Sequence, residues 1–255
     1  MRILLTNDDG FGAAGLSAAL DALVGHEVYV AAPTEQMSAV SARLTIREPV
    51  VCRAASLPGA AGAWEVEGTP VDCVKLALAE LLPAPPDLVV SGFNHGPNVG
   101  QDVFYSGTVA AALEAVMFGY AALAVSLASE KALETARRAL PALTRVAVEW
   151  EAAGRMALNA NVPAEDDPPV VVVRHGNARY EYGYRREGED GGRTLYRIYG
   201  RHEADPSPDT DSSALALGCL ALTPLIPSFD AFPADRRAAV ADLARLVALH
   251  FPVLR

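Results

Sequence analysis

The chain has 255 residues, enough for one large α/β domain with an ordinary core or for two small domains. About half of the residues are hydrophobic (51%), a composition typical of globular proteins and not of disordered ones. The 31 acidic and 21 basic side chains give a formal charge of −10, which argues against a nucleic-acid polymer as partner, because proteins that bind such polymers carry a basic surface.

The chain begins with the pattern of a parallel β-α-β unit. Residues 2–6 are a short apolar run that predicts a buried strand, and residues 15–24 repeat leucine at helical spacing. Residues 27–31 predict a second strand, which ends at Pro33.

Strands and helices continue to alternate up to about residue 152. The sequence predicts short strands at 44–51 and 63–66, a helix at 70–82 that Pro70 opens, a buried strand at 87–90, a small-residue helix at 107–118, a strand at 121–127 and a helix at 130–152 that is kinked or split at Pro141.

The character of the chain changes after Pro163. Residues 170–173 predict one more buried strand, and tyrosines then alternate with charged residues on both sides of a charged, Gly-rich turn, which predicts a β-hairpin. Residues 233–250 predict a terminal helix. We therefore expect a single α/β domain over residues 1–255, divided into a core at about 1–175, a projecting β-hairpin at about 178–200 and a C-terminal helical arm at about 225–255.

The cysteines and the apolar runs bear on the cellular location of the protein. Cys52, Cys73 and Cys219 are odd in number and far apart, without a CxxC pair, which favours reduced thiols in a cytoplasmic protein. We recognise no signal peptide and no apolar run of membrane-spanning length, so no membrane partner is expected.

Gly10, Gly12 and Gly15 follow the first strand and open the first helix, so they match the dinucleotide-binding pattern GxGxxG. A dinucleotide-dependent oxidoreductase is one interpretation. Two observations oppose it: Asp8 and Asp9 lie where a pyrophosphate would approach, and no acidic residue ends the second strand to hold a ribose. Glycines that only permit a tight turn are the simpler interpretation.

Asp8 and Asp9 follow the first strand, at the edge where parallel sheets bind ligands. Two adjacent carboxylates repel each other, and a hard cation relieves that repulsion. Asn94 follows the buried strand at 87–90 and offers an amide oxygen that Mg²⁺ and Mn²⁺ accept. The alternative is ordinary turn chemistry for Asp8-Asp9-Gly10, Asn94 and Asn98, with an aspartate as helix cap.

Ser106, Gly107 and Thr108 precede the small-residue helix at 107–118. Backbone N–H groups at a helix start, together with two hydroxyls, form an anion site that needs no basic side chain. A plain Ser/Thr helix cap is the alternative. We favour a phosphate site, because this segment follows the Asn94 loop.

A set of motifs, in order along nearly the whole chain, resembles the pattern of the SurE family. They are Asn7-Asp8-Asp9-Gly10, Ala32-Pro33 with Ser38, Gly68-Thr69-Pro70, Ser91-Gly92-x-Asn94 with Asn98, Tyr105-Ser106-Gly107-Thr108 and the alanines after it, Asn159-x-Asn161-Val162-Pro163, and Thr210-Asp211. The chain departs from the family pattern around Ser38, where Thr34, Glu35, Ala39 and Ser41-Ala42-Arg43 stand, so the shape of that loop and its substrate contacts do not carry over.

The resemblance implies a Rossmann-like, mostly parallel sheet flanked by helices, and a 5'-nucleotidase that removes phosphate from nucleoside 5'-monophosphates, and in the family sometimes from 3'-monophosphates and short polyphosphate. It implies one divalent metal ion per subunit, Mg²⁺ or Mn²⁺, bound by Asp8, Asp9, Ser38 and Asn94. It also implies a homodimer or homotetramer built with the hairpin and the terminal arm.

The mechanism we expect is attack of water on phosphorus with the metal as Lewis acid. Asp8 and Asp9 are the expected catalytic residues, and Asn98, Ser106, Gly107 and Thr108 are expected to orient the phosphate of a nucleoside monophosphate. An aspartate acting as covalent nucleophile is an alternative. A non-catalytic metal or nucleotide sensor that uses the same crevice is another.

Overall fold

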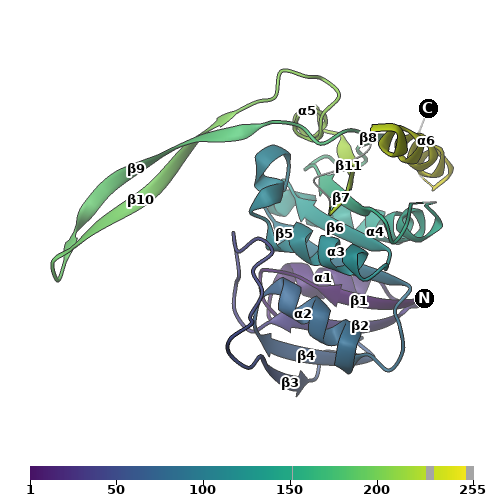
Figure 1. Ribbon diagram of the computed structural model, residues 1–255. Helices are drawn as coiled ribbons and strands as arrows, with labels where there is room; N and C mark the ends of the chain where they lie inside the picture. The colour runs from purple at the N-terminus through teal and green to yellow at the C-terminus, as the bar shows by residue number, and fades with distance from the viewer. Residues whose placement is uncertain (151, 228–232, 251–255) are drawn as a thin grey trace.

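The computed structural model describes residues 1–150, 152–227 and 233–250. In these residues a nine-stranded sheet lies between two layers of helices (Figure 1). In chain order its strands are β1 (Arg2–Thr6), β2 (Glu27–Pro33), β3 (Val51–Ala55), β4 (Gly62–Glu67), β5 (Leu88–His95), β6 (Ala122–Leu127), β7 (Ala157–Val162), β8 (Val170–Val172) and β11 (Leu220–Leu225). The spatial order is β3-β4-β2-β1-β5-β6-β7-β11-β8, with antiparallel pairing only of β3 with β4 and of β7 with β11. The predicted α/β fold with a mostly parallel, Rossmann-like sheet is confirmed.

Helices cover both faces of the sheet. They are α1 (Ala14–Ala22), α2 (Pro70–Leu76), α3 (Gly107–Met117), α4 (Leu133–Glu149), α5 (Asp211–Ala216) and α6 (Pro233–His250), with the short turns η1 (Ala77–Leu81), η2 (Gly100–Phe104) and η3 (Glu130–Ala132). Leucines and alanines of α1, α4 and α6 share one buried cluster with the sheet, and α2 and α3 share the other. The core therefore lies on both sides of the sheet, as in doubly wound folds.

The chain changes direction across the sheet at β1. β1 pairs in parallel with β2 on one side and with β5 on the other, so successive crossovers leave it in opposite directions. In such sheets the crevice outside the carboxyl ends of the strands, at the switch point, is the usual ligand site. The ends of β1 and β5 are therefore the place to look for function.

Helix α2 begins where the sequence predicted, at Pro70. Thr69 is its N-cap, and its side chain accepts from the backbone N–H of Asp72, whose carboxylate in turn accepts from Thr69 N at 2.9 Å. Thr45 adds two further hydrogen bonds, from its N–H at 3.0 Å and its hydroxyl at 2.7 Å. Burial raises the pKa of Asp72, but these hydrogen bonds outweigh burial, and the pKa lies below its ordinary value.

The predicted hairpin is present as β9 (Arg179–Asp190) and β10 (Arg193–Glu203), joined at Gly191 and Gly192 and projecting well away from the sheet (Figure 1). Both turn glycines have positive φ, a conformation that side chains other than glycine rarely adopt. The hairpin forms a separate two-stranded sheet with exposed tyrosines. Its arms are longer than we predicted from the tyrosine pattern alone.

Several elements differ from the prediction. Residues 44–50 form a loop, and the strand expected there begins only at Val51. Strands β7 and β11 and helix α5 were not predicted, because asparagines and a proline interrupt the apolar patterns of the two strands. Helix α4 is one continuous helix through Pro141, since Leu140 and Leu143 are buried in the core on either side of the proline.

The core extends beyond residue 175, where we expected it to end, because β11 inserts between β7 and β8. The terminal helix also has a place in this core: Leu243, Leu246 and Val247 of α6 are buried against the rest of the chain. Residues 228–232 and 251–255 of the predicted arm lie outside the described residues. Within the described chain, no helix combines the length and apolar character needed to cross a membrane.

Candidate active site

The first part of the site is the turn that follows β1. Asn7 is buried and donates from its side-chain amide to the carbonyl of Gly10 at 3.0 Å, which closes the turn around the two aspartates. Gly10 has φ of +100°, as the turn requires. Asp8 is 4% exposed and Asp9 is half-buried, so the two carboxylates occupy different environments although they are adjacent in sequence.

Thr108, at the start of α3, holds the Asp8 carboxylate. Its backbone N–H donates to Asp8 Oδ2 at 3.1 Å, and its hydroxyl donates to Asp8 Oδ1 at 2.5 Å. Burial raises the pKa of the Asp8 carboxyl, the hydrogen bonds from Thr108 act against this, and the charge of Asp9 raises the pKa further. Asp8 is thus fixed in orientation and electrostatically suited to a nearby cation.

The end of β5 supplies the next groups. The backbone N–H of His95 donates to Asp9 Oδ2 at 3.0 Å and so joins the end of β5 to the turn after β1. The Asn94 amide nitrogen donates to the carbonyl of Gly96 at 2.6 Å, and the amide oxygen is the atom of this side chain that can act as an acceptor or a metal ligand. The His95 ring is exposed.

The loop between β2 and β3 crosses the site and carries Ser38. Met37 N donates to the Asp8 carbonyl at 2.7 Å, and Ser41 donates from its N–H to Tyr105 O at 3.0 Å. These bonds on either side place the exposed Ser38 at the cavity. Ala39, directly after it, has φ of +58°, a left-handed conformation that favours glycine.

A cavity of about 200 Å³ gathers these groups. Its lining includes five of the predicted site residues, Asp8, Ser38, Asn94, Asn98 and Ser106. Asp9, Gly107 and Thr108 adjoin it through their contacts with His95 and Asp8. The structure therefore brings the predicted set together from four separate segments of the chain, although the role of each residue remains a prediction.

The sequence left the start of α3 open to a helix cap or a phosphate site, and the structure shows the cap. Ser106 is the N-cap, and its hydroxyl accepts from Val109 N at 3.0 Å, so the capping interpretation holds for this residue. Gly107 lies so close to Asp8 that an added Cβ would stand 3.0 Å from the Asp8 Cβ. The two donors of Thr108 face Asp8 and not open cavity, which makes Thr108 a support for the carboxylate.

Asn98 lies deeper in the cavity, 7% exposed. Its side-chain nitrogen lies 2.8 Å from the hydroxyl oxygen of Ser126. A hydroxyl can accept from the amide nitrogen or donate to the amide oxygen, so Asn98 can present either end of its amide to a ligand. Contact with phosphate, whose oxygens accept hydrogen bonds, requires an amide N–H, either the second hydrogen of Nδ2 or the nitrogen of the flipped amide.

The donor set fits a hard divalent cation. Among the described residues no group of three or more His, Cys, Asp or Glu side chains could hold a metal. The cavity offers instead carboxylate, amide and hydroxyl oxygens, and such oxygen ligands suit Mg²⁺ or Mn²⁺ and not zinc. A bound cation would also relieve the repulsion between the buried Asp8 and its neighbour Asp9.

The turn after β1 and the packing of α1 explain two of the three glycines in the GxGxxG pattern. An added Cβ on Gly15 would stand 2.2 Å from the Phe93 carbonyl, so this glycine lets α1 approach β5. Gly10 adopts the turn conformation described above, and Gly12 has nothing within 4 Å of the added Cβ. Turn and packing requirements account for the first and third glycines, and they support the simpler interpretation over a dinucleotide site.

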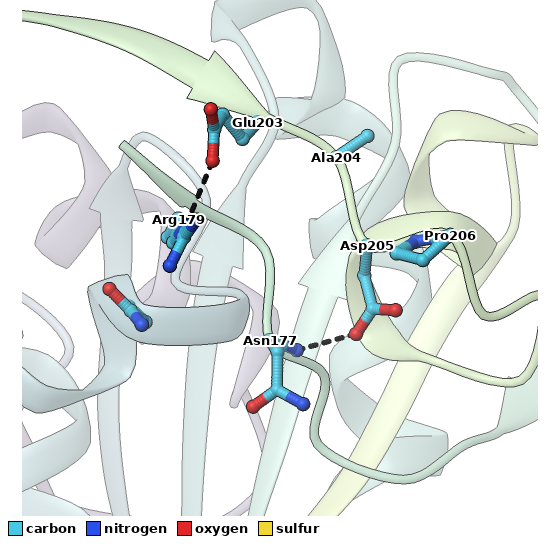
Figure 2. Close-up of a pocket in the computed structure, with 7 residues that line it drawn as sticks. Asn177, Arg179, Glu203, Ala204, Asp205 and Pro206 are labelled. Carbon is cyan, nitrogen blue, oxygen red and sulfur yellow. Dashed lines mark hydrogen bonds and ion pairs between the residues drawn. The ribbon is translucent and has the colours of Figure 1, made fainter. Parts of the chain in front are cut away.

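A second cavity, of about 360 Å³, lies at the base of the hairpin (Figure 2). Arg179 pairs there with Glu203 at 2.9 Å, and Asp205 accepts from the backbone N–H of Asn177 at 2.6 Å (Figure 2). Arg179 and Glu203 are thus paired with each other, and Asp205 is bound by a backbone amide. Its ordered polar contacts fix the base of the hairpin beside η2.

Sequence reasoning missed the residues that support the site from the second half of the chain. Asn159 and Asn161, buried in β7, contact Asn98, and the buried Asp211 contacts Gly100. These residues entered the prediction only as family motifs. Two asparagines two positions apart in an otherwise apolar segment were the available signal, since alternate residues of a strand share one face.

Comparisons with known proteins agree on one family. A family model described as "Survival protein SurE" matches residues 3–182. A protein named 5'-nucleotidase SurE from Desulforudis audaxviator is 42% identical over 88% of this chain and 91% of its own length. One of the same name from Pelotomaculum thermopropionicum is 40% identical over 88% and 89%. The crystal structure of the SurE protein from Aquifex aeolicus aligns with a TM-score of 0.75 and 30% identity over 96% of this chain and all of that one.

Proposed function

The chain belongs to the SurE family, and from this membership we propose that it is a 5'-nucleotidase, a hydrolase that releases phosphate from nucleoside 5'-monophosphates with the help of one divalent metal ion per subunit. The proposal extends to 3'-monophosphates and short polyphosphate. Its main support in this chain is a single observation. Two carboxylates, an amide, a hydroxyl and a helix N-terminus meet at one cavity, at the switch point of the sheet.

Asp8, Asp9, Ser38 and Asn94 are the residues proposed to hold the metal. When bound, Mg²⁺ or Mn²⁺ would act as a Lewis acid on a phosphoryl oxygen and lower the pKa of the attacking water. Thr108 keeps the Asp8 carboxylate in one orientation, and His95 N does the same for Asp9. Such preorganised ligands need no rearrangement during the reaction.

The phosphate is proposed to lie against the start of α3. The N-terminus of this 11-residue helix carries a partial positive charge, and the Ser106 hydroxyl can donate while it accepts from Val109 N. Asn98 supplies an amide on the other side of the cavity. The half-exposed ring of Tyr105 lines the same cavity and offers a surface for the nucleoside.

Attack by water is the proposed chemical route. Both oxygens of Asp8 accept hydrogen bonds from Thr108, which supports a ligand role for Asp8 over a role as covalent nucleophile. Asp9 is less buried than Asp8 and closer to solvent. It is the carboxylate better placed to accept a proton from the water.

The test is phosphate release from AMP by protein treated with a chelator and then supplied with Mg²⁺ or Mn²⁺. Asp8→Asn and Asp9→Asn should each abolish turnover without unfolding the protein, because they keep the shape of the side chain. Asp166→Asn, on an exposed side chain remote from the cavity, is the matched control and should keep full activity.

Three results would contradict the proposal. Full activity in excess chelator would rule out the metal. Wild-type turnover in both aspartate variants would show that Asp8 and Asp9 only form a turn and have no part in the reaction. Nucleotide binding without any phosphate release would instead support the non-catalytic sensor.

Assembly as a homodimer or homotetramer is part of the proposal. The hairpin exposes Tyr184, Tyr196 and Ile198 far from the sheet, and apolar side chains in that position favour contact with a second copy of the chain. Sedimentation of the full chain and of a Tyr196→Lys/Ile198→Lys variant tests this. An unchanged oligomer would remove the hairpin from the interface. The cysteines are free, which supports a cytoplasmic location.

A further inference from the structure

The loop over residues 94–106 carries two parts of the proposed site, Asn94 at one end and the Ser106 cap at the other. Most of this loop is outside regular strands and α-helices. A loop that must hold ligands to a few tenths of an ångström needs anchors of its own. Its anchors come from the second half of the chain.

The first anchor is a pair of asparagines in β7. Asn161 Oδ1 accepts from the backbone N–H of Asn98 at 2.7 Å, and Asn161 Nδ2 donates to the backbone carbonyl of Asn98 at 3.0 Å. Asn159 Nδ2 donates to the same carbonyl at 2.8 Å. Both asparagines are fully buried, so water does not compete for these bonds.

The second anchor is Asp211, at the start of α5 and fully buried. One carboxylate oxygen accepts from Gly100 N at 3.0 Å, and the other accepts from Gly176 N at 3.0 Å and from Ser212 N at 2.8 Å. This carboxylate therefore ties the active-site loop to the segment that leads into the hairpin.

That segment makes two further contacts with the same part of the loop. His175 Nε2 donates to the Gly100 carbonyl at 2.6 Å, and Gln101 N donates to Ala178 O at 2.8 Å. Gly100 has φ of +52°, and a Cβ there would stand 2.3 Å from the Ala178 carbonyl. Residues 98–101 are thus held by hydrogen bonds from two directions.

We propose that Asn161 and Asp211 are positioning residues of the reaction: they fix residues 98–101, and so set the place of Asn94 and of the phosphate seat relative to Asp8. Neither side chain lines the cavity. Each acts through backbone groups of the loop. Both side chains are buried, so a hydrogen bond that is lost when a donor is replaced by an acceptor, or an acceptor by a donor, cannot be replaced by one to water. The kinetic part of this proposal rests on the proposed function.

Two substitutions of nearly equal shape test it. Asn161→Asp replaces the amide nitrogen that donates to Asn98 O with an oxygen, so that two acceptors face each other. Asp211→Asn replaces one carboxylate oxygen with an N–H donor, which must face Gly100 N or Gly176 N. Thr223→Val is the matched control: Thr223 is fully buried beside Asn159 in the sheet, and its hydroxyl has no partner in the described part of the chain.

The first measurement is hydrogen exchange of each protein without substrate. We expect both variants to lose protection at the amides of Asn98, Gly100 and Gln101, whereas β1 and β5 keep theirs and Thr223→Val matches the wild type. This readout does not depend on activity. Uniform loss of protection over the whole sheet, or wild-type protection of the loop, would overturn the proposal.

The second measurement is turnover of AMP per folded molecule, well below the unfolding temperature, together with binding of Mn²⁺ to the free protein. We expect kcat to fall on the order of 10²-fold, as for a misplacement of about 1 Å, and Mn²⁺ binding to weaken. Raising Mn²⁺ should restore binding but not the full kcat.

Wild-type kcat in folded Asp211→Asn would overturn the proposal, whatever happens to Asn161→Asp, in which a new buried charge can itself prevent folding. If the wild-type chain releases no phosphate at all, the proposed function is wrong. The exchange experiment then still decides whether the anchors hold the loop.

Discussion

Gly107→Ala is the sharpest test of the contact between α3 and Asp8, the carboxylate proposed to act in catalysis. The added Cβ would stand 3.0 Å from Asp8 Cβ, 3.1 Å from Asp8 Oδ2 and 3.2 Å from Pro70 Cγ. Contacts this short oblige the neighbours to move by a few tenths of an ångström. The Pro70 ring starts helix α2 and is buried, so Asp8 is the group expected to shift.

The expected effects on stability and on catalysis differ in size. Alanine has fewer unfolded conformations than glycine and gains about 0.4–1 kcal/mol on that account, whereas overpacking costs about 1–3 kcal/mol. The net loss of stability is therefore at most about 2–3 kcal/mol. A shift of about 1 Å at a reacting group costs about 10²-fold in rate, so a smaller shift of Asp8 should lower kcat on the order of 10-fold to 10²-fold.

The assay is phosphate release from AMP at saturating Mn²⁺, with unfolding by urea measured in parallel. Gly12→Ala is the matched control, because its added Cβ would have nothing within 4 Å. It should keep wild-type kcat and gain about 0.4–1 kcal/mol of stability. A folded Gly107→Ala protein with wild-type kcat would refute the reasoning, since Asp8 would then tolerate displacement.

Further predictions follow from the same geometry. Thr108→Val removes the hydroxyl donor of Asp8, and should cost about 1–3 kcal/mol in urea unfolding and on the order of 10²-fold in kcat. Ala39→Gly should raise the free energy of unfolding by about 1 kcal/mol, because it relieves a left-handed alanine. The lowered pKa of Asp72 means that its stabilising effect is present above about pH 3.9 and is lost as pH falls further through the folded-state pKa. Asp72→Asn should therefore destabilise the protein at pH 7, and by progressively less as the pH falls below about 3.9, by urea midpoints. Tyr105→Ala should raise KM for AMP on the order of 10-fold with less effect on kcat, if the ring stacks on the base. Wild-type behaviour of any of these variants would contradict the interaction, or for Ala39→Gly the backbone strain, on which its prediction rests.

The first half of the fold could be predicted from sequence because its signals are local. Residues 2–6 and 27–31 are continuous apolar runs of strand length, and Pro70 begins its helix where the pattern placed it. The tyrosine alternation that predicted the hairpin is equally local. Each of these elements is specified by residues within one turn or one strand of itself.

Strands β7 and β11 could not be recognised in this way. Asn159 and Asn161 interrupt the apolar run of β7, and Pro224 stands inside β11. The asparagines of β7 can be buried because their polar side chains form hydrogen bonds with distant parts of the chain, as Asn161 does with Asn98. The local sequence pattern therefore argues against a strand here, because the contacts that stabilise this strand are tertiary. Asn159 and Asn161, which interrupt the apolar pattern of β7, are the residues that bind the loop at Asn98.

The same limit applies to Thr108. A Ser-Gly-Thr segment before a helix predicts free donors at the helix start, and from the sequence those donors are available to a cap or to a phosphate. In the fold, Ser106 takes the cap, and the two Thr108 donors go to a carboxylate 100 positions away in the chain. No spacing rule predicts that choice, because it depends on how closely α3 approaches β1, and Gly107 sets that approach. The absence of a side chain at Gly107 is therefore as necessary to the site as Asp8, because it leaves room for Asp8 beside α3.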